Sequence, residues 1–260
     1  ARALTDPAAA PCLPPLRALL SQIFYEKVWR FDGKCAIIRL DIANYVLGGR
    51  IMSVKYEVLK ALVRASGLKK RWNMSTEELL ENRRRANAGN KIPALKDPAL
   101  DIGQIKVCGC PVLTMKHKEG AAGANLFIIG GGMISAPRPG SIKKALRFAR
   151  ETGLDLYVPY YPLCTDYPLT KAYEMIHAAY REMLRSSYAP EKISVLGTSS
   201  GGNLALGMVP YINESAPDTP MPGYIMAISP GTCVDGDEEW QRMLELDKKD
   251  VAIPARYMKT

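Results

Sequence analysis

The segment that most restricts how this chain can fold is a serine flanked by glycines. The short apolar run ISVL leads into GTSSG at residues 197–201, and a helical pattern begins directly afterwards. A tight turn between a strand and a helix drives its middle residue, Ser199, towards a positive φ. Gly197 and Gly201 leave the space that side chains two residues away would otherwise fill. The turn would lift the Ser199 hydroxyl above a sheet, and the Ser200 amide would point towards a developing negative charge at the start of the helix.

The second half of the chain alternates apolar runs with helical patterns. Residues 104–117 read as two short strands. Runs typical of further buried strands occupy residues 125–132, 154–162, 191–197 and 222–230. Helical patterns occupy residues 141–153, 169–188 and 200–212. Ser141 is expected to cap the first of these helices and Gly153 to end it. This alternation predicts an α/β fold with a mostly parallel central sheet and helices on both faces.

The first 104 residues have a different pattern and predict a separate organisation. Residues 1–51 are rich in proline and weakly periodic, either an irregular arm or an upstream leader preceding a start at Met52. Residues 52–104 predict two helices and a linker. The second helix begins with a capping box, in which Ser75 caps the Glu78 amide, and it ends near Gly89. Residues 105–260 are then the α/β core.

Composition limits the possible partners. Residues 1–150 hold 26 Lys and Arg residues against 11 Asp and Glu, and the remainder holds 9 against 15. Basic residues are scattered over several predicted helices without a nucleic-acid-binding motif, so we expect a solvated basic face and no nucleic-acid partner. No apolar run reaches about 18 residues, so no membrane span is expected. The six cysteines have no metal-ligand spacing and read as reduced thiols of a cytoplasmic protein.

A second glycine cluster strengthens the interpretation of Ser199 as a nucleophile. Gly130, Gly131 and Gly132 follow the predicted strand at residues 125–129. Glycine amides at such a strand end can approach a substrate oxygen without interference from side chains. Neither glycine cluster has the Gly-Lys-Ser/Thr of a phosphate-binding P-loop.

Three segments in this order resemble the bacterial hormone-sensitive-lipase-like esterases of the α/β-hydrolase fold. FIIGGGM resembles the His-Gly-Gly-Gly loop of that family, YYPLCTDYPLTKAYEMIHAAYREML resembles its Asp-Tyr-Arg-Leu-Ala-Pro stretch, and ISVLGTSSGGNLAL resembles its nucleophile segment. The resemblance runs over residues 105–235, and the helices of residues 55–88 lie where the family has its cap.

The resemblance implies a function and a set of site residues. Ser199 would be the nucleophile, and the amides of Gly131, Gly132 and Ser200 would form the oxyanion hole. The implied reaction is hydrolysis of a small carboxylic ester through an acyl-enzyme, without a cofactor or metal. The sequence departs from the family at Ile129, which replaces the loop histidine. Thr198 replaces the aspartate before the serine, and Pro162 and Asp166 replace an arginine and a glutamate.

The catalytic acid and base are not found where the family has them. Both histidines precede Ser199. His117 is expected at a charged strand end or turn, and His177 on the solvent-facing side of its helix, so neither is a credible base. Asp235 is the one candidate acid, although an acidic solvated loop is the favoured interpretation of its surroundings.

Three interpretations of this departure stay open. The chain is a truncated esterase lacking the last strands of the sheet, it pairs with another polypeptide, or it is a non-catalytic small-molecule binder on a hydrolase scaffold. A sheet ending at residues 222–230 would leave a bare edge strand, which favours homo-oligomers or association through the C-terminal region. Residues 237–260 are expected to fold back as a helix, with Trp240, Met243 and Leu244 facing inward.

Overall fold

The computed structural model describes residues 27–31, 34–38, 54–72, 74–231 and 236–255. They fall into two compact units, Ala1–Tyr56 and Glu57–Thr260. In the first unit, strands β1 (Lys27–Phe31) and β2 (Lys34–Ile38) pair antiparallel. The prediction of an irregular segment over residues 1–51 therefore missed this hairpin. Each strand has only five residues, too few for a clear alternation of apolar and polar side chains.

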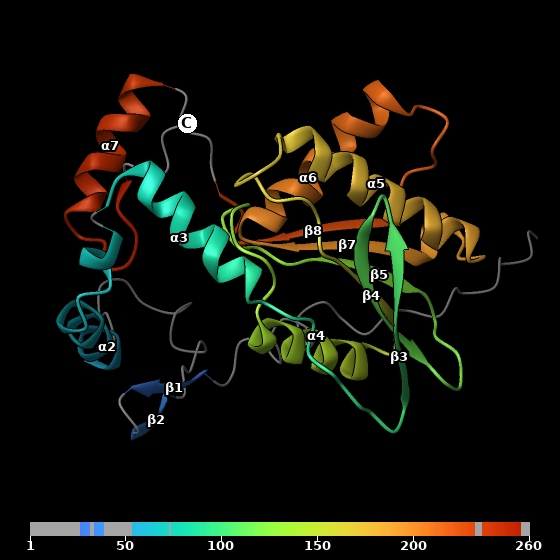
Figure 1. The fold of residues 1–260 in the computed structure, drawn as a ribbon, viewed down its shortest axis with the longest axis horizontal. Helices are drawn as coiled ribbons and strands as arrows, with labels where there is room; N and C mark the ends of the chain where they lie inside the picture. The colour runs from blue at the N-terminus through green and yellow to red at the C-terminus, as the bar shows by residue number, and fades with distance from the viewer. Residues whose placement is uncertain (1–26, 32–33, 39–53, 73, 232–235, 256–260) are drawn as a thin grey trace, which may run out of the picture. The chain divides into compact units, whose positions relative to one another are not determined.

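The second unit is built on a six-stranded sheet with the order β3-β4-β6-β5-β7-β8 (Figure 1). The strands are β3 (Leu100–Val107), β4 (Cys110–His117), β5 (Ala124–Ile128), β6 (Asp155–Pro159), β7 (Ile193–Thr198) and β8 (Tyr224–Ile228). β3 and β4 are antiparallel, while β6, β5, β7 and β8 run parallel to one another. The predicted mostly parallel sheet is confirmed.

Side-chain alternation along the strands builds a core on both faces of this sheet. Leu126 and Ile128 of β5 belong to the cluster shared with the helices α5 (Leu169–Arg185) and α6 (Ser200–Ser215). Between them, Phe127 points the other way and lies 5.6 Å, ring to ring, from Phe148 of α4 (Pro139–Thr152). Figure 1 shows α5 and α6 on one face and α4 on the other. The period of two in the strand therefore decides which helix each side chain meets.

The helix patterns are largely confirmed, with one error at a helix start. α5 buries the predicted face, with Ala172, Met175, Ile176, Ala179, Tyr180 and Met183 in the core. α4 ends at Gly153, which has the left-handed φ of +68° that glycine tolerates. It begins at Pro139 rather than after Ser141, and no side chain caps it. The prediction of a Ser141 cap was wrong because Pro139 already fits the first helical position.

The segment before the sheet contains the expected helices. α2 (Val54–Ala65) is followed by a 3₁₀ turn, η2 (Lys69–Trp72), and then by α3 (Thr76–Ala88). Ser75 accepts a hydrogen bond from the Glu78 amide at 3.1 Å, as the capping box predicted. No helix among the described residues is both long enough and apolar enough to cross a membrane.

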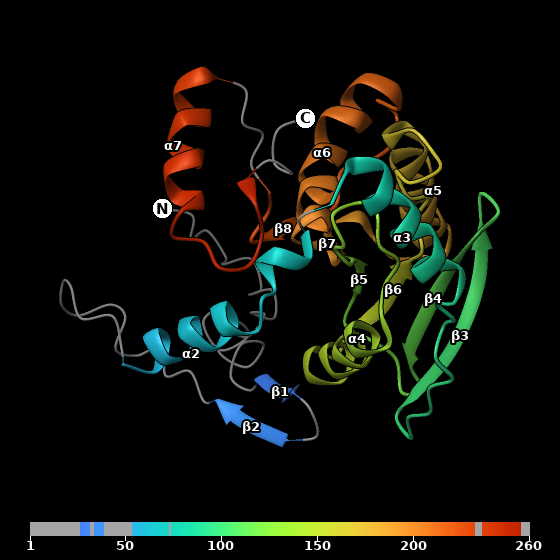
Figure 2. The ribbon, with the colours of Figure 1, turned by 60° about the vertical axis from the view of Figure 1, so that its left-hand side comes forward.

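β8 is one of the two edge strands of the described sheet, and its side chains are poorly covered. Tyr224 is exposed, and the other four residues of β8 are only half-buried, whereas every residue of β5 and β6 is buried. The last helix is α7 (Asp237–Asp247) (Figure 2). None of its residues is buried. A helix was expected there, but Leu244 is exposed rather than facing inward, because α7 does not pack into the core.

Candidate active site

Ser199 lies at the corner where β7 becomes α6. Its φ of +53° and ψ of −129° are unusual for a residue with a side chain. Its N–H donates to the Ile228 carbonyl oxygen at 2.9 Å, which ties the corner to the end of β8. Ser199 is exposed, whereas its neighbour Ser200 is buried. The predicted strand–turn–helix corner is confirmed, and the Ser199 hydroxyl is accessible at the carboxyl end of the parallel strands.

The flanking glycines allow main-chain groups to approach too closely for any side chain. A Cβ atom on Gly197 would lie 2.0 Å from the Gly201 carbonyl oxygen. A Cβ atom on Gly201 would lie 2.2 Å from the Ile128 carbonyl oxygen. The turn at residues 197–201, called the elbow below, therefore has its two ends in contact with each other. Its second end also contacts the end of β5.

The segment of residues 129–136 that follows β5, called the glycine loop below, lies directly beside this corner. A Cβ atom on Gly130 would lie 2.1 Å from the Thr198 carbonyl oxygen and 2.8 Å from Cβ of Ser199. Further along the loop, Gly132 and Met133 both have a positive φ, of +63° and +60°. The loop and the elbow, 68 residues apart at their Gly130–Thr198 hydrogen bond, therefore lie side by side.

Hydroxyl groups hold the loop in place. The Gly130 N–H donates to Thr198 Oγ1 at 3.2 Å. The N–H groups of Gly131 and Met133 both donate to Ser200 Oγ, at 3.0 and 3.2 Å. Thus Thr198, which stands where the family has an aspartate, and Ser200 both bond the loop. The sequence had shown only that Ile129 removes a histidine; it had not shown what replaces it.

Tyr161 forms a hydrogen bond with the first residue of the loop. Its hydroxyl donates to the Ile129 carbonyl oxygen at 3.0 Å. Burial raises the pKa of Tyr161 to about 12, so the phenol stays protonated and remains a donor at neutral pH. Beside it, the Cys164 N–H donates to the Met133 carbonyl oxygen at 2.8 Å. The YYP motif after β6 was thus a usable signal for a loop contact.

Helix α3 contacts the loop from the other side. The Asn87 side chain donates to the Ile134 carbonyl oxygen at 2.9 Å and accepts from the Ala136 N–H at 3.0 Å. Arg84 forms an ion pair with Asp166 at 2.9 Å, in the segment that follows β6. The Arg84 contact also lowers the pKa of Asp166, after the larger effect of Thr165. Nothing in the pattern of α3 had predicted these contacts, because asparagine and arginine are common on solvated helix faces.

Neither histidine of the sequence contacts Ser199. β4 runs antiparallel to β6, so His117 at the end of β4 lies where β6 begins. Its main-chain N–H donates to Asp155 Oδ1 at 2.7 Å, and its ring Nε2 lies 3.0 Å from the Ala149 carbonyl oxygen. His117 therefore lies at the opposite end of the sheet from Ser199, which follows the last residue of β7.

His177 is buried, and its expected exposure to solvent was wrong. It is 8% exposed, with Nε2 3.1 Å from Thr219 Oγ1 and its ring 5.5 Å from that of Tyr211. α6 lies alongside α5, and its residue Tyr211 covers the face of α5 that carries His177. The charged residues near His177 had suggested that this face is polar. Burial, and secondarily Arg181, lowers the pKa of His177, which favours the neutral imidazole. Asp235, the candidate acid, lies outside the described residues.

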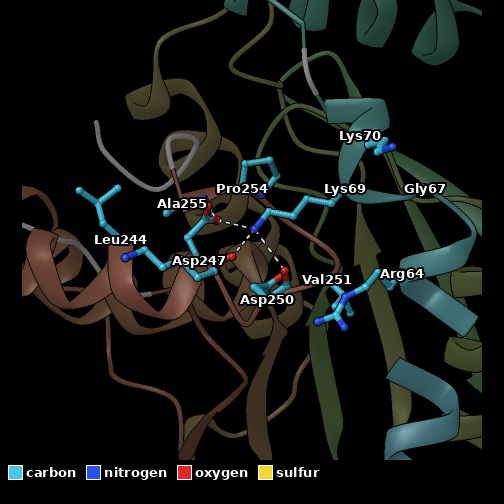
Figure 3. A pocket seen from close by; sticks show the side chains of 11 residues that line it. Arg64, Gly67, Lys69, Lys70, Leu244, Asp247, Asp250, Val251, Pro254 and Ala255 are labelled. Carbon is cyan, nitrogen blue, oxygen red and sulfur yellow. Dashed lines mark hydrogen bonds and ion pairs between the residues drawn. The ribbon is translucent and has the colours of Figure 1, made fainter. Parts of the chain in front are cut away.

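Three cavities in the described part of the second unit are lined by residues other than Ser199. One of about 250 Å³ is lined by Asn87, Ser135 and Arg138, among others, on the α3 side of the glycine loop. A larger one of about 600 Å³ lies between the α2–η2 segment and residues 244–255 (Figure 3). No three His, Cys, Asp or Glu side chains gather as possible metal ligands in the part of the chain that the structure describes.

Lys69 occupies the larger cavity and joins its two walls. Its amine pairs with the Asp247 carboxylate at 2.9 Å and donates to the carbonyl oxygens of Asp247 and Asp250, the latter at 3.1 Å (Figure 3). All three acceptors contact one amine. The cavity therefore contains a contact that holds η2 against residues 247–250, in addition to any space for a ligand.

Comparison with known proteins agrees with this geometry. A family model described as the alpha/beta hydrolase fold matches residues 126–259, just over half of the chain. The chain belongs to the α/β-hydrolase fold family. The Ser199 corner is therefore a feature of a member of this family. The same chain has free thiols at Cys108, Cys110 and Cys164. No curated protein matches the chain.

Solved structures of esterases share the fold at low sequence identity. EstE5 soaked with p-nitrophenyl butyrate is 20% identical, with a TM-score of 0.58 over 80% of this chain and 67% of that one. An esterase from the bacterial hormone-sensitive lipase family is 19% identical, with a TM-score of 0.58 over 80% and 68%. An esterase/lipase from an uncultured bacterium is 22% identical, with a TM-score of 0.56 over 75% and 65%. The chain thus spans about two thirds of the length of these structures.

Proposed function

We propose that this chain carries the nucleophile and oxyanion site of a carboxylic ester hydrolase for short-acyl esters. The observation that carries the proposal is the strained Ser199, at φ +53°, directly beside the glycine loop. Strain at an exposed residue persists only where the surrounding structure enforces it, and such positions cluster at functional sites. The structural neighbours, which include an esterase of the hormone-sensitive lipase family, support ester chemistry.

The chemistry follows from the groups at the site. Ser199 Oγ would attack the carbonyl carbon of the ester, and the negative charge on the carbonyl oxygen would be stabilised by glycine-loop and Ser200 amides. Collapse of the tetrahedral intermediate breaks the ester C–O bond and releases the alcohol, leaving an acyl group on Ser199. The Ser199 proton has to pass to a base, and water then has to be deprotonated to remove the acyl group.

The proposal includes impaired catalysis in this chain by itself. His117 and His177 are bonded elsewhere, so the Ser199 hydroxyl has no imidazole to take its proton. In serine hydrolases, removal of the base alone costs about as much as removal of the whole triad, roughly 10⁶-fold in kcat. We therefore expect hydrolysis of small activated esters to be very weak. A cytoplasmic location, which three free thiols support, is also part of the proposal.

Chemical rescue with imidazole tests this proposal. Hydrolysis of p-nitrophenyl butyrate would be followed over an imidazole series with the wild-type chain and with Ser199→Ala. We expect imidazole to raise the wild-type rate above that of Ser199→Ala, because it supplies the missing base to the serine. His117→Ala and His177→Ala should leave this rescue unchanged. Identical rates for wild type and Ser199→Ala at every imidazole concentration would contradict the proposal.

A non-catalytic small-molecule binder on the same scaffold is the second candidate. It is favoured by the burial of His177 and the position of His117, which leave Ser199 without an imidazole from this chain. In the rescue experiment this candidate predicts no imidazole effect that depends on Ser199.

A further inference from the structure

The Ser200 hydroxyl joins the glycine loop to the elbow. Ser200 is 9% exposed, and its Oγ accepts the N–H groups of Gly131 at 3.0 Å and Met133 at 3.2 Å. A serine hydroxyl has two acceptor lone pairs and one proton. The two amides use the lone pairs, so the proton is left for a third partner.

Tyr161 is the candidate for that third partner. The residue is 4% exposed, and the Ser200 side chain opposes the rise of its pKa, as a hydroxyl that donates to the phenol oxygen does. Its own proton goes to the Ile129 carbonyl oxygen at 3.0 Å. Tyr161 donates to the first residue of the loop, and its phenol oxygen is available to the Ser200 proton. Ser200 and Tyr161 together bond three main-chain groups of the loop, and buried hydrogen bonds of this kind fix a single arrangement.

The network divides the amides of the site into two groups. The Gly131 and Met133 amides point inward to Ser200. The Gly132 amide lies between them, at φ +63° on an exposed residue, and has no acceptor among the described residues. The Ser200 N–H is the first of α6, where no intrahelical acceptor exists. Two amides are thus held by a side chain, and two are free to meet a substrate oxygen.

We propose that Ser200 is a positioning residue of the oxyanion site, whose hydroxyl holds the glycine loop so that the main-chain N–H groups of Gly132 and Ser200 bind the substrate oxygen. In this arrangement Gly131 anchors the loop rather than donating to the substrate. The inference rests on the proposed ester chemistry at Ser199. The hydroxyl of Ser200 supplies these bonds in a loop that has Ile129 where the family has a histidine.

Hydrogen–deuterium exchange of the full chain tests the anchor without relying on activity. In Ser200→Ala, we expect the amides of Gly131 and Met133 to exchange about tenfold faster, because each loses its hydrogen-bond acceptor. Ser194→Ala is the matched control, since the Ser194 hydroxyl on β7 bonds the Asn125 side chain and not the loop. Unchanged protection of Gly131 and Met133 in Ser200→Ala would overturn the proposal.

Two further measurements make the test decisive. If Ser200→Ala does not fold, as judged by circular dichroism, Tyr161→Phe replaces it. That variant removes the partner of the Ser200 proton and the donor to Ile129, so faster exchange over residues 129–133 is expected, and unchanged exchange overturns the proposal. The rate at which p-nitrophenyl butyrate acylates Ser199, followed by mass spectrometry, should fall about tenfold or more in Ser200→Ala, because a loosened loop misplaces the donors.

The two proposals fail in different ways. If the wild-type chain is not acylated at Ser199 but Ser200→Ala loosens the loop, the ester chemistry is wrong and the anchor stands as a structural feature without a positioning role. If Ser199 is acylated equally fast in the wild type and in a folded Ser200→Ala, the positioning role is wrong and the ester chemistry stands.

Discussion

Replacing Gly197 by alanine perturbs the elbow at its tightest point. The new Cβ atom would lie 2.0 Å from the Gly201 carbonyl oxygen and 2.4 Å from its carbonyl carbon, whereas real Cβ atoms essentially never approach within 3.0 Å. The obstructing atoms belong to the main chain of α6, so no side chain can rotate away. Either β7 or the first turn of α6 has to move by about 1 Å.

The expected cost follows from this overlap. Overpacking of a well-packed region costs about 1–3 kcal/mol, and a clash between main-chain segments belongs at the upper end, at about 3 kcal/mol. For a chain of this size, such a loss lowers Tm by roughly 6–12 °C. Acylation of Ser199 should also fall, because the hydroxyl moves with the turn.

Gly140→Ala is the matched control for this substitution. Gly140 lies in the first turn of α4, and a Cβ atom there would meet nothing within 4 Å. Alanine should be neutral or stabilising by about 0.5–1 kcal/mol at that position, because it is the better helix former. Urea denaturation followed by circular dichroism gives both values. A Gly197→Ala variant within about 0.5 kcal/mol of the wild type, a change typical of surface substitutions, would refute the description of the elbow.

Three other predictions concern the surroundings of the site. Asn87→Ala should destabilise the chain by about 1–2 kcal/mol and speed exchange at Ala136, since two hydrogen bonds to the loop are lost; Asn82→Ala, on the same helix, should do neither. The pKa of Asp247 is lowered, chiefly by Lys69 and then by the Ala255 N–H, so this contact stabilises the chain above the ordinary carboxyl pKa and is lost as the pH falls through the lowered value. Limited proteolysis of residues 244–255 should therefore increase at acid pH in the wild type and already at neutral pH in Lys69→Met. The exposed edge strand β8 should cause association that sedimentation velocity detects, and Tyr224→Lys should abolish it; a wild type that stays monomeric at high concentration would contradict this.

The sequence was sufficient for the elements whose pattern has a local cause. Gly197 and Gly201 predicted the corner because a side chain at either position would collide with the main chain. The apolar period of α5 predicted which of its faces is buried. The capping residue Ser75 predicted the start of α3 for the same local reason.

The features that sequence analysis missed depend on contacts between distant segments. His177 looked polar because Glu174 and Arg181 flank it on the helix, and only the position of Tyr211 on α6 buries it. Ser200 reads as an ordinary helix-start residue until Gly131 and Met133, nearly 70 residues earlier, meet its hydroxyl. Such pairings follow from the order of strands in the sheet and have no signature in either segment alone.

Trapping of an acyl group on Ser199 tests the central claim most directly. The full chain would be incubated with p-nitrophenyl butyrate and digested, and the peptide that contains Ser199 would be weighed by mass spectrometry. The account predicts that one butyryl group accumulates slowly on Ser199 and none in Ser199→Ala, because neither acylation nor deacylation is assisted by an imidazole of this chain. Butyryl groups distributed over surface lysines, with Ser199 unmodified, would contradict it.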